Sequence, residues 1–79
     1  MNLMDALPIE TLLRAEYDIN FKRLRDFTIV ILHKGAPNDR KNIDGERIIH
    51  VQKDGFWYVN RHGIETFIPA HRILELKPK

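Results

Sequence analysis

The sequence contains neither cysteine nor serine among its 79 residues. Without cysteine the chain can form no disulfide and no thiolate metal site, and this composition predicts a cytoplasmic location. Its glycines are isolated and match neither a P-loop nor a dinucleotide-binding fingerprint. Without serine, the hydroxyl nucleophiles are the tyrosines and three threonines outside any nucleophile turn motif, namely Thr11, Thr28 and Thr66. These absences argue against covalent catalysis.

Long hydrophobic runs are also missing. No segment approaches the ~20 apolar residues that a membrane helix needs, and the first residues do not form a signal-peptide pattern, so we expect no membrane partner. Thirteen Lys and Arg residues stand against 11 Asp and Glu residues, which gives a formal net charge of +2. Acids dilute each basic cluster, so charge alone does not indicate a nucleic-acid binder. The length predicts a single domain over residues 1–79.

Hydrophobic periodicity predicts one short helix and five strands. A proline at a first helical turn and apolar residues at helical spacing predict a helix over about 8–16. A continuous apolar run predicts a strand over about 27–33 that is central and covered on both faces. Residues 35–45 are predicted to be a long polar loop. Four further strands, joined by tight turns, are predicted over about 47–52, 56–60, 64–68 and 72–76.

The short connections between these strands determine the expected architecture. Strands joined by tight turns pair in the antiparallel direction. Because a proline interrupts the chain before the last strand, we expect one five-stranded, strongly bent antiparallel sheet, a small SH3-like open barrel. The short N-terminal helix is expected to pack against one face or one end of this sheet. The predicted fold class is therefore α+β.

The four histidines do not form a metal-binding pattern. No two of them stand at helical i, i+4 spacing or in an H-x-H pattern. Zinc prefers nitrogen and sulfur donors, and the chain has no cysteine to supply sulfur. The paired H-x-T or H-x-S motifs of two-histidine phosphoesterases are also missing. We therefore expect no metal and no cofactor.

The most informative motif is Ile68-Pro69-Ala70-His71-Arg72-Ile73. Its proline fixes one φ angle and removes a backbone donor, so a strand should stop or bend there. The bend places a guanidinium fork, which fits phosphate in a bidentate manner, beside an imidazole that can donate a hydrogen bond near neutral pH. His71 and Arg72 are therefore candidate phosphate ligands. The alternative is an ordinary bend whose polar tips lie in water, and the residues alone favour this alternative somewhat.

Three consecutive aromatic residues lie on one predicted strand. Side-chain alternation places Phe56 and Tyr58 on one face and Trp57 on the other. One face should belong to the core, and the opposite face can present a ring on which a nucleobase stacks. Trp57 and Tyr58 are the base-stacking candidates, although rings in so small a core usually stabilise the fold. Arg61 and His62, in the adjacent turn, can contact phosphates or serve as ordinary turn residues.

Several of these segments together resemble the small family called the RNA cyclic group end recognition domain. They are Tyr17-Asp18 after the helix, the apolar strand followed by Gly35-Ala36-Pro37, and the I-P-x-H-R-I segment. The likeness covers about residues 7–76. It implies recognition of RNA ends that carry a 2′,3′-cyclic phosphate, in RNA processing or repair.

The resemblance also implies roles for individual residues. By position, His71 and Arg72 would bind the RNA end, and Lys34 stands where the family usually has an arginine. The pair His33-Lys34 departs from the acidic-then-arginine pair of the family, and lysine meets a phosphate as a point charge without a fork.

These observations predict a non-catalytic RNA-binding module that recognises RNA termini. Its partners would be a single-stranded RNA 3′ end and an RNA-processing enzyme. One alternative is a small cyclic phosphodiesterase or RNA-cleaving enzyme that uses His71 with another histidine. Another is a protein-interaction adaptor for an RNA-processing enzyme. The predicted RNA- and phosphate-binding residues are His71, Arg72, Lys34, Arg61 and His33.

Overall fold

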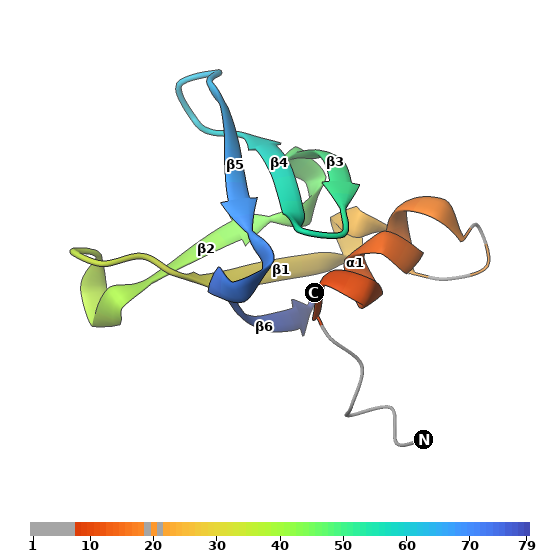
Figure 1. Ribbon diagram of the computed structural model, residues 1–79, viewed down its shortest axis with the longest axis horizontal. Helices are drawn as coiled ribbons and strands as arrows, with labels where there is room; N and C mark the ends of the chain where they lie inside the picture. The colour runs from red at the N-terminus through yellow and green to blue at the C-terminus, as the bar shows by residue number, and fades with distance from the viewer. Residues whose placement is uncertain (1–7, 19, 21) are drawn as a thin grey trace.

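The computed structural model describes residues 8–18, 20 and 22–79 and has an α+β fold (Figure 1). In these residues there is one α-helix, α1 (Pro8–Tyr17), and there are two separate antiparallel sheets of three strands each. The predicted class is confirmed, and the arrangement is open rather than a closed barrel. The prediction of a single five-stranded sheet is wrong. The first seven residues of the predicted domain lie outside the described residues.

The first sheet has the strand order β2-β1-β6, and the second has the order β3-β4-β5. In the second sheet the strands follow one another through tight turns, as the turn signals predict, and their bounds differ from the predicted ones by at most one residue. The strands are β1 (Phe27–Leu32), β2 (Arg40–Asp44), β3 (Ile48–Gln52), β4 (Gly55–Val59), β5 (Glu65–Pro69) and β6 (Ile73–Pro78).

Strand β1 lies at the centre of the first sheet. Its register places Ile29 opposite Ile43 of β2 and Leu76 of β6. Ile29, Val30 and Ile31 are all buried, although successive side chains of a strand point to opposite faces. The predicted central strand, covered on both sides, is confirmed.

Strand β2 falls within residues 35–45, which were predicted to be a loop, and this prediction is wrong. Four of the five β2 residues are exposed and only Ile43 is buried, so the strand lacks an apolar alternation that the sequence could show. Its backbone nevertheless pairs with β1 along its full length, from Thr28 opposite Asp44 to Leu32 opposite Arg40. Tertiary pairing therefore overrides a weak local β propensity, and the exposed charges suit an edge strand.

The predicted bend at Pro69 is present. It takes the form of a 3₁₀ turn, Ala70–Arg72, after which β6 begins at Ile73. The helix α1 packs against β3 of the second sheet and β6 of the first (Figure 1). Buried residues of the helix and of both sheets form one hydrophobic core: Ile9, Leu12, Ala15, Phe27, Ile29, Ile31, Ile43, Ile48, Val51, Phe56, Tyr58, Ile68 and Ile73.

Another 3₁₀ turn, Gly45–Arg47, connects β2 of the first sheet to β3 of the second. The side chain of Asp44 caps this turn, because its Oδ1 accepts the backbone N–H of Glu46 at 2.9 Å. Since β2 leads directly into the turn and β3 leaves it, the turn determines how the inner face of β2 lies relative to the second sheet. The candidate site described below lies at this junction.

Candidate functional site

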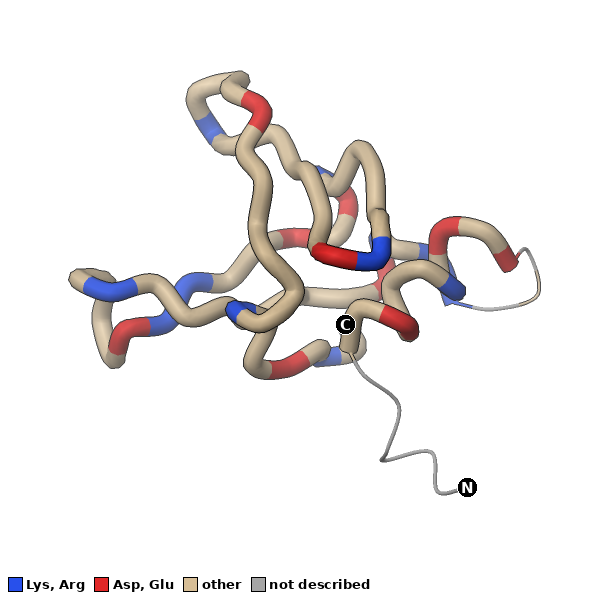
Figure 2. Tube along the Cα trace, viewed as in Figure 1, with Lys and Arg blue, Asp and Glu red and all other residues tan. Residues whose placement is uncertain are grey.

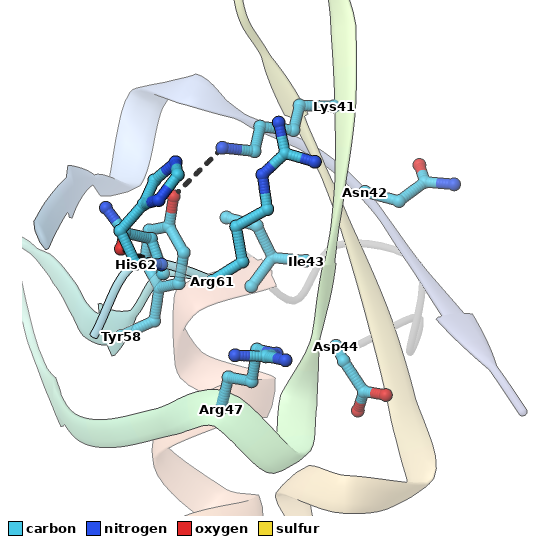
Figure 3. A pocket seen from close by; sticks show the side chains of 9 residues that line it. Lys41, Asn42, Ile43, Asp44, Arg47, Tyr58, Arg61 and His62 are labelled. Atoms are coloured by element: carbon cyan, nitrogen blue, oxygen red, sulfur yellow. Dashed lines mark hydrogen bonds between the residues drawn. The ribbon is translucent and has the colours of Figure 1, made fainter. Parts of the chain in front are cut away.

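A cleft of about 490 Å³ lies between β2, the turn Gly45–Arg47, the end of β4 and the loop that follows β4 (Figure 3). Small-molecule sites in proteins usually have volumes of roughly 300–1,000 Å³, so the cleft can hold a ligand of about the size of one nucleotide. The residues that line it are Lys41, Asn42, Ile43, Asp44, Arg47, Tyr58, Asn60, Arg61 and His62.

Two strands of different sheets contribute the centre of this cleft. On β2, alternation places Lys41 on the same face as the buried Ile43, and on β4 it places Tyr58 on the same face as the buried Phe56. Across the gap, the Lys41 ammonium donates a hydrogen bond to the Tyr58 hydroxyl oxygen at 3.3 Å. The same ammonium lies 5.8 Å from the centre of the Tyr58 ring, within cation–π range.

The loop between β4 and β5 presents Arg61 and His62 at the mouth of the cleft. Its conformation is fixed by Asn60, whose Oδ1 accepts the backbone N–H groups of His62 at 2.8 Å and of Ile64 at 3.0 Å. Gly63 adopts a φ of 77°, in the left-handed region that glycine enters without strain. The two side chains are therefore displayed from a hydrogen-bonded turn.

The charged side chains of the lining are cationic except for Asp44. Figure 3 shows Lys41 and Arg61 directed toward the cleft, whereas Asn42 and Asp44 project from the other side of β2. Over the described residues as a whole, basic and acidic residues are interspersed (Figure 2). The positive character therefore comes from the local convergence of three cations from three segments, Lys41, Arg47 and Arg61.

The carboxylate of Asp44, the acidic residue of this lining, has partners of its own. It is paired with the ammonium of Lys79 and also accepts the N–H of Glu46. The Lys79 hydrogen bond, the Glu46 hydrogen bond and the charges of Lys79 and Arg47 together lower the pKa of the Asp44 carboxyl. The acid is therefore ionised at neutral pH, and Lys79 offsets its charge, so it opposes anion binding in the cleft only weakly.

Arg72 has a structural partner at a different corner of the molecule. Its Nε and Nη2 donate to the backbone carbonyl oxygen of Leu32, the last residue of β1, at 3.0 and 2.8 Å. Its Nη2 also lies 3.4 Å from Nδ1 of His33. The guanidinium fork thus connects the turn before β6 to the end of β1, which agrees with the interpretation of this segment as a structural bend.

We expect Arg72→Gln to lower the free energy of unfolding by about 1–2 kcal/mol, because both hydrogen bonds from a charged donor to the Leu32 carbonyl are lost. In a domain of this size this corresponds to a fall in Tm of roughly 4–15 °C, measured by thermal denaturation. The control is Arg61→Gln on the exposed loop, expected to change stability by less than about 0.5 kcal/mol. Equal stability of the two variants would contradict the structural role of Arg72.

The predicted phosphate ligands lie in two places, the cleft beside β2 and the region around Arg72 at the end of β1. The structure brings His33 and Arg72 together, with Lys34 and His71 as their exposed chain neighbours. Of the five predicted ligands, Arg61 lines the cleft and the other four do not.

The two predicted stacking residues lie on opposite faces of β4, as the alternation predicts. Tyr58 is 5% exposed and belongs to the core, whereas Trp57 is 36% exposed on the outer face. There the Trp57 ring lies 5.2 Å from the ring of Phe67 on β5, at an interplanar angle of 52°. Trp57 therefore offers an accessible ring, and Tyr58 offers mainly its hydroxyl.

Sequence reasoning missed two cations of the cleft, Lys41 and Arg47. The signal for Lys41 was the spacing of two residues between it and Ile43, which places both on one face of a strand. That signal is readable only once residues 40–44 are recognised as a strand. Arg47 was predicted to begin a strand, but it closes the 3₁₀ turn between the sheets.

The described residues contain neither a cluster of metal-binding side chains nor a membrane-spanning helix. Within residues 8–18, 20 and 22–79, no three His, Cys, Asp or Glu side chains are grouped so that they could hold a metal ion. No helix of the described residues is long and apolar enough to cross a membrane.

Comparison with known proteins identifies archaeal homologues. A UPF0248 protein of Methanococcus vannielii is 45% identical over 53 residues, which cover 67% of this chain and 57% of the relative. A UPF0248 protein of Methanocaldococcus jannaschii is 38% identical over 60 residues, 76% of this chain and 66% of the relative. One of Methanococcus maripaludis is 43% identical over 51 residues, 65% of this chain and 59% of the relative.

The homologues of this chain are thus UPF0248 proteins, and their names state neither a ligand nor an activity. The chain spans between 57% and 66% of the length of these curated relatives. No family model matches the sequence, and no solved structure matches it.

Proposed function

We propose that this chain is a non-catalytic, cytoplasmic RNA-binding module that recognises RNA termini and holds a terminal 2′,3′-cyclic phosphate in the cleft beside β2. The observation that carries the proposal is the convergence of Lys41, Arg47 and Arg61 on a nucleotide-sized cleft whose acidic neighbour, Asp44, is paired with Lys79. The resemblance to the RNA cyclic group end recognition family points to the same ligand.

The chemistry of the cleft suits a terminal phosphate. A cyclic phosphate is a monoanion with two exposed oxygens, which one arginine fork and one ammonium can satisfy together. Arg61 supplies the fork and Lys41 the ammonium, and His62 adds an imidazole donor from the same loop. A single-stranded end suits a small cleft better than a duplex, because its terminal nucleotide is free to enter.

The remaining predicted ligands take lesser roles in this proposal. Lys34, His33 and His71 lie at the exposed turns near the ends of β1 and β6, where they can steer the RNA backbone electrostatically. Trp57 can stack with a base that precedes the terminal nucleotide. Because few phosphates are contacted, affinity should be modest and fall with rising salt concentration.

The alternative of a cyclic phosphodiesterase requires a general acid and a general base. His62 is the histidine that lines the cleft, and His71, the histidine named for this alternative, is not among the lining residues. This arrangement supports binding over turnover. An RNA-processing enzyme remains the partner we propose to carry out the chemistry.

The proposal is tested by fluorescence anisotropy at fixed, moderate salt with one short RNA prepared with three ends: 2′,3′-cyclic phosphate, linear 3′-phosphate and free 3′-hydroxyl. We expect the cyclic end to bind at least about tenfold more tightly than the hydroxyl end, which corresponds to about 1.4 kcal/mol. The RNA is analysed for ring opening and cleavage after each titration. Product would establish the enzyme, and equal weak binding of all three ends would contradict end recognition and favour the adaptor.

A further inference from the structure

The hydroxyl group of Tyr58 lies in the cleft although the rest of its side chain is buried. Tyr58 is 5% exposed, and its ring packs against Phe56 with the ring centres 6.2 Å apart. Tyr58 also lines the cleft, opposite Lys41 of β2 (Figure 3). The ring face is therefore unavailable for stacking, and the hydroxyl is the part of this residue that a ligand can reach.

The hydrogen-bonding state of this hydroxyl follows from its partner. A lysine ammonium has three donors and no acceptor, so in the 3.3 Å contact the Tyr58 oxygen accepts from Lys41. The hydroxyl proton must then be directed elsewhere. Among the hydrogen bonds of the described residues, none uses this proton. Tyr58 thus keeps an unused donor, and the neighbouring ammonium polarises it further.

We infer that the Tyr58 hydroxyl is a specificity-determining donor, which forms a hydrogen bond with a phosphate oxygen of the terminal group bound in the cleft. This inference rests on the proposed function, and it assigns to Tyr58 a role in recognising the phosphate rather than in stacking with a base. Lys41 acts twice in this arrangement. It attracts the anion, and by donating to the Tyr58 oxygen it leaves the hydroxyl proton for the ligand.

The chemistry of the inferred contact defines which ligand it recognises. A phosphate oxygen accepts hydrogen bonds strongly because it carries negative charge. A free 3′-hydroxyl end offers no anionic oxygen at the terminus, so it should gain much less from Tyr58. The hydroxyl should therefore contribute to the preference for phosphate-ended RNA, and little to the binding of RNA in general.

Tyr58→Phe tests this inference because it removes the hydroxyl and keeps the ring in the core. We expect it to weaken binding of RNA with a cyclic-phosphate end by tenfold to hundredfold, the effect of losing one hydrogen bond to a charged group. Binding of the same RNA with a 3′-hydroxyl end should remain unchanged. The matched control is Tyr17→Phe, the same chemical change at the second tyrosine, which is 65% exposed on α1 and outside the cleft.

A parallel titration of Arg61→Gln separates this inference from the proposed function. If Arg61→Gln weakens binding of the cyclic-phosphate RNA and Tyr58→Phe does not, the cleft is supported as the binding site. The inference that the Tyr58 hydroxyl forms a hydrogen bond with the phosphate is then wrong. If neither variant changes affinity, both the inference and the proposed site are overturned. Thermal denaturation of Tyr58→Phe should give a Tm near that of the unsubstituted protein, so that lost binding reports the hydroxyl rather than the fold.

Discussion

Gly45→Ala is expected to destabilise the protein by about 3 kcal/mol or more, the largest effect on stability that we predict for a change this small. A Cβ atom at this position would lie 1.8 Å from the carbonyl oxygen of Leu24 and 2.8 Å from that of Phe27. Both are backbone atoms, so no side-chain rotation can relieve the overlap. The chain before β1 or the turn between the sheets would have to move.

The size of this effect matters because the protein is small. A folded domain of 79 residues is expected to have a free energy of unfolding of only roughly 4–12 kcal/mol. The loss should appear in urea unfolding as a lower midpoint. The control is Gly35→Ala, where the added Cβ has no atom within 4 Å and the cost comes from the positive φ alone, about 1–2 kcal/mol. If Gly45→Ala were no less stable than Gly35→Ala, the close packing of this turn would be contradicted.

Arg61→Gln is expected to weaken binding of RNA with a cyclic-phosphate end by tenfold to hundredfold. The guanidinium of Arg61 is displayed at the mouth of the cleft by the loop that Asn60 fixes. Its loss removes charge-assisted hydrogen bonds worth roughly 1.5–3 kcal/mol, and each 1.4 kcal/mol corresponds to tenfold in affinity. The measurement is fluorescence anisotropy with the phosphate-ended RNA.

The matched control for this prediction is Arg40→Gln. Arg40 is exposed on β2 directly before Lys41, and strand alternation directs the two side chains to opposite faces. Both variants remove one positive charge, so long-range attraction to RNA decreases similarly in each. A larger loss for Arg61→Gln therefore reports direct contact in the cleft. Equal losses would indicate nonspecific attraction and would refute the assignment of Arg61.

The sequence predicted the elements whose pattern is local. The helix α1 follows from a proline at its first turn and apolar residues at helical spacing, and β1 follows from an uninterrupted apolar run. The second sheet follows from turn signals at Lys53-Asp54-Gly55 and at Arg61-His62-Gly63. These features depend on neighbouring residues, so they can be read without knowledge of the tertiary structure.

Features that depend on long-range pairing could not be predicted. Strand β2 is polar, and it forms a strand because it pairs with β1. The sequence pattern therefore did not predict this strand, nor the division of the strands into two sheets. The same reason explains why Lys41 was missed at the cleft. Arg72 looked like a phosphate ligand from its neighbours in sequence, but its partner is a carbonyl at Leu32, 40 residues away. Of the predicted ligands, Arg61 lines the cleft, because the loop between β4 and β5 to which it belongs lies at the mouth of the cleft.

The position of the bound RNA end is the central claim of this account. Amide chemical-shift mapping by NMR tests it directly, with labelled protein titrated with a short RNA that ends in a 2′,3′-cyclic phosphate. We predict that the largest shift changes occur at residues 41–47 and 58–62, which surround the cleft. Changes centred instead on residues 32–34 and 70–72, around the Arg72 corner, or no changes with the cyclic end, would contradict the account.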